Sequence, residues 1–103
     1  MKVVRHVTIR GRVQGVGFRY FVLQRVLDIL GRDLKLEGWV RNRSDGSVEA
    51  LFAGEPEAVV DIVEACRKGP TGARVEALEE READSAQLAL RPPGQPFSLL
   101  ATA

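Results

Sequence analysis

The sequence predicts an α+β fold in which two helices cover one face of an antiparallel sheet. Apolar residues alternate with polar ones in four stretches and recur at helical spacing in two others. These stretches follow one another as strand, helix, strand, strand, helix, strand. The 103 residues are 45% apolar and 28% charged, which favours one globular domain over 1–103.

The first strand and the first helix follow directly from this periodicity. Residues 3–13 alternate between an apolar and a polar face, which predicts a half-buried strand. From 18 to 30 the apolar residues take a helical period, and Gly31 is positioned to cap the C-terminal end of that helix. The polar face of the strand carries His6, Thr8, Arg10 and Arg12.

A β-hairpin is predicted over 34–53, because two alternating stretches flank the turn 43–46, which contains an Asp-Gly pair. A fourth strand is predicted over 73–82, where the many charged residues favour a solvated strand edge. We expect the tail to add a short C-terminal edge strand at 97–100.

The second helix is predicted over 55–69, with Pro56 near its first position and Gly69-Pro70 at its end. Cys66 lies on the apolar stripe of this helix, so we interpret it as a core residue and not as a nucleophile. Because it is the only cysteine, no internal disulfide can form, which fits a reducing cytoplasm.

Composition and motifs exclude several classes of function. A net charge of +1 does not indicate binding to nucleic acid or to an acidic membrane. No stretch approaches the ~20 apolar residues of a membrane span, and charged residues interrupt the N-terminus before a secretory signal forms. The chain has no P-loop motif and no His, Cys, Asp or Glu cluster with metal-site spacing. We therefore expect chemistry without a metal or other cofactor.

The order of elements brings two distant segments together. Each half of the order is a split strand-helix-strand unit, which gives the ferredoxin-like arrangement. A right-handed crossover makes the first two strands parallel, so both end at the same edge of the sheet. Asn42 has the parity of Val40 and points to the helix side, close to the loop 13–18. We therefore expect Arg19 and Asn42 to be neighbours.

Arg19 stands at the start of the first helix, where the macrodipole disfavours a cation. Gly15 and Gly17 precede it, and a glycine-containing loop that enters a helix presents free N–H groups to an anion such as phosphate. A bound dianion would explain the arginine, whose planar fork holds two phosphoryl oxygens. The alternative is that the glycines only shape a strand-to-helix turn, that Arg19 is an ordinary surface residue and that Asn42 belongs to a turn.

These residues resemble the acylphosphatase family. The resemblance rests on GRVQGVGFRYF (11–21) and GWVRNRSDGSVEA (38–50), with a weaker match in CRKGPTGARVEALE (66–79). It implies an enzyme that hydrolyses the carboxyl-phosphate bond of acyl phosphates to a carboxylate and inorganic phosphate, without a metal. It also implies that Asn42 orients the attacking water. The substrate-binding residues that it implies are Gln14, Gly15, Val16, Gly17, Phe18 and Arg19.

One segment departs from the family pattern. Within 27–38, the link between the first helix and the second strand is several residues longer than the family's usual link. We expect the extension at the edge far from the loop, where it alters packing and not the site. The partners expected are a small-molecule acyl phosphate and inorganic phosphate, as product and competitor, with no nucleic acid, no membrane and a monomeric protein.

Two other functions share this topology. An RNA-recognition module would stack bases on aromatic residues of the open sheet face, where Trp39 is the lone candidate. A non-catalytic or regulatory domain that binds an acyl or carbamoyl phosphate, as at the start of hydrogenase-maturation carbamoyltransferases, would use the same anion nest. Such a domain would bind the acyl phosphate as an enzyme does, so only a measurement of hydrolysis distinguishes the two.

Overall fold

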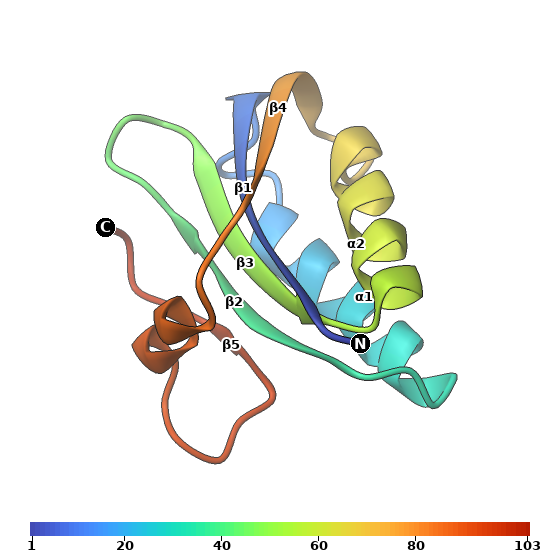
Figure 1. The fold of residues 1–103 in the computed structure, drawn as a ribbon. Coiled ribbons are helices and arrows are strands. Elements are labelled where there is room, and N and C mark those ends of the chain that lie inside the picture. Colours follow the sequence, from blue (N-terminus) through green and yellow to red (C-terminus); the bar gives the residue numbers. More distant parts are fainter.

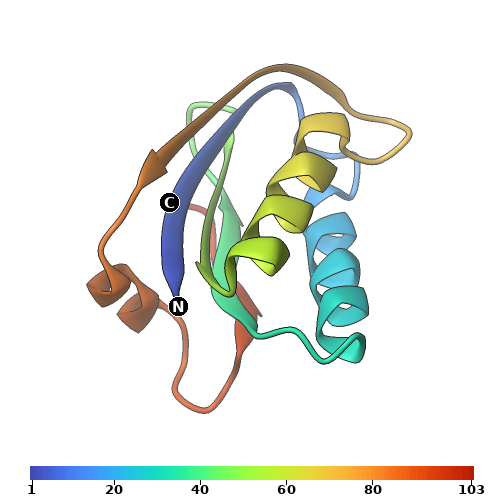
Figure 2. The same ribbon diagram turned by 45° about the vertical axis from the view of Figure 1, so that its right-hand side comes forward.

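In the computed structural model, which describes all of residues 1–103, a five-stranded sheet in the order β4–β1–β3–β2–β5 carries two helices on one face (Figures 1 and 2). The elements are β1 (Val3–Arg12), α1 (Phe18–Gly31), β2 (Leu36–Asn42), β3 (Val48–Gly54), α2 (Pro56–Lys68), β4 (Arg74–Glu82), a 3-10 helix η1 (Ser85–Leu90) and β5 (Phe97–Leu99). The predicted ferredoxin-like order and the C-terminal edge strand are confirmed.

The prediction of an antiparallel sheet is confirmed for the four main strands, and the direction of the extra edge strand, which the sequence does not predict, comes from the structure. β4, β1, β3 and β2 pair antiparallel, but β5 runs parallel to β2, so the sheet is mixed. The reason is the path of the tail, which leaves β4 at one edge, passes through η1 and joins β2 at the other edge (Figure 1). β5 is held there by the core, because the ring of Phe97 stacks on that of Phe52 with centroids 5.9 Å apart.

The helix-covered face contains the hydrophobic core. Alternation in β1 places Val7 and Ile9 there, opposite the helical stripe of α1. Cys66 of α2 is fully buried in the same cluster, and burial raises the pKa of its thiol to about 12, which confirms its interpretation as a core residue. None of the helices has the length and continuous apolar character needed to span a bilayer.

The prediction that Gly31 caps α1 is wrong. Gly31 is the last helical residue, and the left-handed conformation falls on Asp33, with a φ of 65°. The turn closes with hydrogen bonds from the N–H of Arg32 to the carbonyl of Ile29 and from the N–H of Asp33 to that of Leu30. Aspartate tolerates this conformation better than most residues, so the chain ends the helix without a glycine there.

The sheet face opposite the helices is not fully open. Trp39 is 1% exposed, and its indole Nε1 donates a 2.9 Å hydrogen bond to the carbonyl of Gln87 in η1. The guanidinium of Arg41 lies 4.8 Å from the ring centroid. The interpretation of Trp39 as an aromatic on an open face is therefore corrected, because η1 and Arg41 occupy the positions where a base would stack.

A buried carboxylate lies beside Trp39 on the same face. Glu49 accepts hydrogen bonds from Nε of Arg41 at 2.7 Å and from Nε2 of His6 at 2.6 Å. Burial opposes ionisation of Glu49, but the two hydrogen bonds and the positive charges hold its pKa below the ordinary 4.5. Glu49 therefore stabilises the folded state in its ionised form.

This carboxylate predicts a loss of stability in acid. A pKa that is lower in the folded state gives stabilisation that is present above 4.5 and is lost as the pH falls through the folded value. In urea unfolding, we expect the free energy of unfolding to fall between about pH 5 and pH 3, and to fall less steeply in Glu49→Gln. Glu76→Gln, which changes an exposed glutamate of β4 without an ion pair and away from any helix end, is the matched control and should leave the slope unchanged.

Candidate functional site

The loop between β1 and α1 presents unpaired backbone donors. Gly15 and Gly17 have φ angles of 73° and 78°, and a Cβ at either position would meet nothing within 4 Å. The glycines are therefore required by the backbone conformation and not by crowding. None of the N–H groups of residues 14–19 donates a hydrogen bond to an acceptor in the protein, and α1 has neither a capping side chain nor an acidic residue in its first turn.

Arg19 is a half-buried cation without a counter-ion. Its guanidinium forms no ion pair or hydrogen bond within the protein. The other arginines without an acidic partner, Arg12, Arg74 and Arg81, are all exposed to solvent. Eight further arginines pair with acids, namely Arg5, Arg10, Arg25, Arg32, Arg41, Arg43, Arg67 and Arg91. An arginine beside unpaired amides forms a site suited to an anion.

Asn42 is the last residue of β2 and is also half-buried. It pairs directly across the ladder with Val48, which belongs to the hydrophobic core, so its side chain lies on the helix-covered face. This confirms the side predicted from its parity with Val40. Its backbone is held by the tail, because the N–H of Ala103 donates to its carbonyl at 3.0 Å. Its carboxamide forms no hydrogen bond within the protein and is free to bind a ligand or water.

The turn after Asn42 is closed by its own polar groups. Asp45 accepts hydrogen bonds from the hydroxyl of Ser47 at 2.6 Å and from its N–H at 2.9 Å. These bonds, with the positive charge of nearby Arg10 and Arg43, lower the pKa of Asp45 to about 2. Asp45 is thus ionised at neutral pH and stabilises the turn. Its oxygens already accept hydrogen bonds from Ser47 and pair with Arg10.

Gln14 joins the loop to this turn. Its side-chain Nε2 donates to the carbonyl of Arg43 at 2.7 Å and to that of Ser47 at 2.9 Å. The loop and the turn lie at the same end of the sheet, the upper end in both views (Figures 1 and 2). The structure therefore brings the two sequence motifs together, while the direct approach of the Arg19 and Asn42 side chains stays a prediction. Sequence reasoning considered only the backbone of Gln14 and missed its side chain, since no local pattern indicates its partners.

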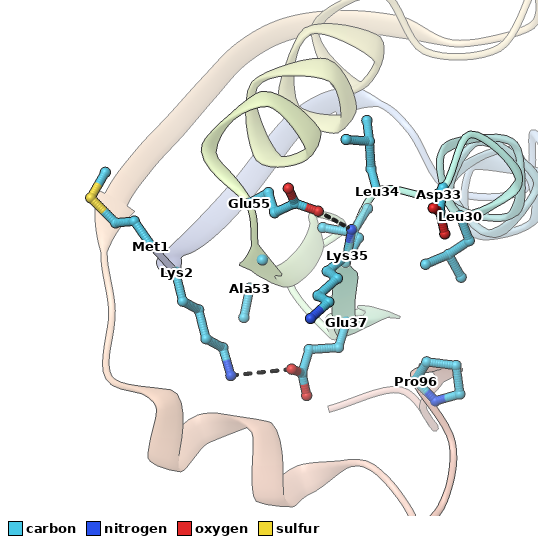
Figure 3. A pocket seen from close by; sticks show the side chains of 12 residues that line it. Met1, Lys2, Leu30, Asp33, Leu34, Lys35, Glu37, Ala53, Glu55 and Pro96 are labelled. Atoms are coloured by element: carbon cyan, nitrogen blue, oxygen red, sulfur yellow. Dashed lines mark hydrogen bonds and ion pairs between the residues drawn. The ribbon is translucent and has the colours of Figure 1, made fainter.

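One surface pocket, of about 940 Å³, lies elsewhere. It is formed mainly by the N-terminus, residues 33–37 and residues 53–55 just before α2, and it contains none of the predicted site residues (Figure 3). In its lining, Lys2 forms an ion pair with Glu37 at 3.1 Å, and the carboxylate of Glu55 accepts a hydrogen bond from the backbone N–H of Lys35 at 2.6 Å. The lengthened link lines this pocket, which confirms that it lies far from the loop.

No group of three or more His, Cys, Asp or Glu side chains has an arrangement that could hold a metal ion. The lone histidine, His6, is bound to Glu49 on the other face of the sheet. The candidate site therefore consists of backbone N–H groups, one guanidinium and one carboxamide. Such a set is suited to binding a phosphoryl group and to positioning a neutral nucleophile.

Comparisons with known proteins show the family. The family model described as Acylphosphatase matches residues 5–89. The chain is 55% identical over 100 residues to an acylphosphatase of Rhodopseudomonas palustris (strain BisB18), covering 97% of this chain and 96% of that protein. The crystal structure of acylphosphatase from Bacillus subtilis superposes with a TM-score of 0.76 at 36% identity, covering 97% of this chain and 99% of that one.

A further likeness shows the fold alone. Full-length HypF in its phosphate- and nucleotide-bound form superposes with a TM-score of 0.78 at 22% identity, covering 99% of this chain but 12% of that one. The same arrangement of strands and helices thus also occurs as a small part of a much larger protein.

Proposed function

The chain belongs to the acylphosphatase family, whose function is the hydrolysis of acyl phosphates, and from this premise we propose which residues carry out the reaction. Arg19 and the backbone N–H groups of residues 14–19 bind the phosphoryl group, and Asn42 orients the attacking water. The proposal covers a single domain over 1–103. It rests chiefly on one observation: a half-buried guanidinium without a counter-ion adjoins a loop of unpaired donors.

The electrostatics of the loop support this assignment. The start of α1 is already electropositive, so Arg19 raises the unfavourable positive potential there unless an anion is present. A phosphoryl group supplies the negative charge and accepts hydrogen bonds from both the backbone and the guanidinium. The glycines leave the approach open, because no atom lies within 4 Å of where their side chains would be.

The chemistry of the substrate explains why so few groups suffice. The leaving group of an acyl phosphate is a carboxylate, which departs without a proton from the enzyme. The phosphoryl group passes through a loose transition state with charge on its equatorial oxygens, where Arg19 and the amides stabilise it. Asn42 holds the water in line with the breaking bond, and the phosphate itself accepts the proton of that water.

The substrate is a small-molecule acyl phosphate, and inorganic phosphate is both product and competitor. We further propose that the protein acts as a monomer in the cytoplasm. The cytoplasmic location fits its only cysteine, Cys66, which is buried and makes no disulfide. Sedimentation of the purified protein tests the oligomeric state. A dimer at micromolar concentration would contradict the monomer without affecting the site.

Turnover without a metal tests the function directly. We expect the protein to hydrolyse benzoyl phosphate at an unchanged rate in excess EDTA, with inorganic phosphate as a competitive inhibitor. Ultraviolet absorbance of benzoyl phosphate follows the reaction, and the uncatalysed hydrolysis rate is the control. Tight phosphate binding without turnover would instead support a regulatory domain, and loss of activity in EDTA would contradict the metal-free mechanism.

A further inference from the structure

The candidate site is assembled from two segments that the sheet does not hold together. β1 and β2 are not neighbours, because β3 lies between them. The β1–β3 ladder ends at the pair of Ile9 with Val48, and the β2–β3 ladder ends at the pair of Asn42 with Val48. Beyond these pairs, no ladder hydrogen bond connects the phosphate loop to the turn that follows Asn42.

The carboxamide of Gln14 spans this gap. The bonds from its Nε2 to the carbonyls of Arg43 and Ser47 are the only hydrogen bonds between residues 13–17 and 43–47. They use both hydrogens of the amide nitrogen. With the side chain reversed, the oxygen of Gln14 would face two carbonyl oxygens, so the acceptors themselves determine the orientation.

The two carbonyls belong to the closure of the hairpin. The carbonyl of Ser47 also accepts from the N–H of Arg43 at 2.9 Å, and the carbonyl of Arg43 also accepts from the N–H of Gly46 at 3.1 Å. Gln14 thus binds the pair of residues that closes the turn, and Arg43 follows Asn42 directly. Gln14 therefore links the loop to the backbone next to Asn42.

We propose that Gln14 is a positioning residue that sets the distance between the phosphate loop and the carboxamide of Asn42. This rests on the proposed roles of the loop and of Asn42. In-line attack requires water and phosphorus in a narrow geometry, and a displacement of about 1 Å can cost on the order of 10²-fold in rate. Because both side-chain hydrogens of Gln14 point to the turn, only its backbone N–H remains for the phosphate.

If Gln14 acts by positioning, its loss should lower kcat and leave the affinity for phosphate nearly unchanged. Gln14→Leu keeps the backbone donor and removes the link, so we expect kcat for benzoyl phosphate to fall by about 10- to 100-fold, with the inhibition constant of inorganic phosphate within about threefold of wild type. Gln24→Leu is the matched control, because Gln24 is an exposed glutamine of α1 without a side-chain hydrogen bond. It should retain wild-type kinetics.

A second variant gives a readout that loss of stability alone would not produce. In Gln14→Glu an ionised carboxylate faces two carbonyl oxygens, whereas a protonated carboxyl group can donate to one of them. We expect kcat of Gln14→Glu, relative to wild type at each pH, to rise as the pH falls from about 7 to about 5. A flat ratio would overturn the proposal even if Gln14→Leu does not fold.

A double-mutant cycle tests whether Gln14 acts through Asn42. We expect Gln14→Leu with Asn42→Ala to be about as slow as Asn42→Ala alone, since there is then no carboxamide left to position. If the loss in kcat of the double variant equals the product of the two single-variant losses, the proposal is overturned. A wild-type kcat in Gln14→Leu would also overturn it. If Asn42→Ala itself retains full activity, the proposed function of Asn42 fails. If Gln14→Leu retains full activity and Asn42→Ala does not, only the inference about Gln14 fails.

Discussion

Arg19→Ala is expected to lose about 10³-fold or more in kcat/KM for benzoyl phosphate, the scale found for arginines that stabilise a transferring phosphoryl group. The loss should appear in binding as well as in turnover, because the guanidinium contacts the phosphoryl oxygens in both the ground state and the transition state. Inorganic phosphate should therefore become a much weaker inhibitor. Steady-state kinetics and phosphate titration measure the two effects separately.

Arg19→Lys should restore little of the activity that is lost in Arg19→Ala. A lysine ammonium is a compact charge and cannot reproduce the planar fork that holds two oxygens at once. Arg81→Ala is the matched control, since Arg81 is another arginine without an acidic partner but lies on β4, opposite His6 and far from the loop. It should stay within about twofold of wild type, as most surface substitutions do.

Folding must be separated from function in this experiment. Arg19 forms no hydrogen bond or ion pair within the protein, so its removal should not lower the thermal midpoint. Removing a cation from the start of α1 should even relieve an unfavourable interaction with the helix dipole when phosphate is absent. A folded Arg19→Ala protein that binds phosphate as well as wild type would contradict the assignment of the anion site.

Asn42→Ala is expected to lower kcat by about 10²- to 10³-fold, the cost typical of removing one positioned hydrogen-bonding group from an active site. The affinity for inorganic phosphate should stay near that of wild type, because the loop and Arg19 remain intact. This contrast with Arg19→Ala separates the group that orients water from the groups that bind the anion. Inhibition by phosphate and single-turnover rates provide the two readouts.

Gln87→Ala serves as the control for loss of a carboxamide. The side chain of Gln87 is exposed in η1 and makes no hydrogen bond, whereas its backbone carbonyl, which Trp39 uses, is retained. This variant should keep wild-type kcat. An Asn42→Ala protein as fast as wild type would remove the water-orienting role and leave the attacking water without a positioning group.

Local sequence patterns predicted some features correctly and failed at others for identifiable reasons. The helical period over 18–30 and the start of α2 at Pro56 depend on neighbouring residues, and both are confirmed. Glycine is common at helix C-terminal caps, which predicts a cap at Gly31, but the chain instead places Asp33 in the left-handed conformation. Several nearby residues could end the helix, and propensity alone did not select among them.

Trp39 illustrates a different limit. Alternation in β2 correctly separates it from the core side of Val40, but it does not show what lies over the opposite face. That depends on η1, which returns from the far edge of the sheet and contributes the carbonyl of Gln87. Such a contact joins residues 48 positions apart, beyond the reach of any periodicity argument.

The sequence by itself determined the order of the elements, the glycine-containing entrance to α1 and the side of the sheet on which Asn42 lies. These features follow from residue spacing and from the handedness of strand-helix-strand connections, which operate locally or constrain topology. Only the tertiary structure decided which polar groups are already engaged. It engages the amide of Gln14 across the site and leaves Arg19 without an acid, because these outcomes depend on where distant segments meet.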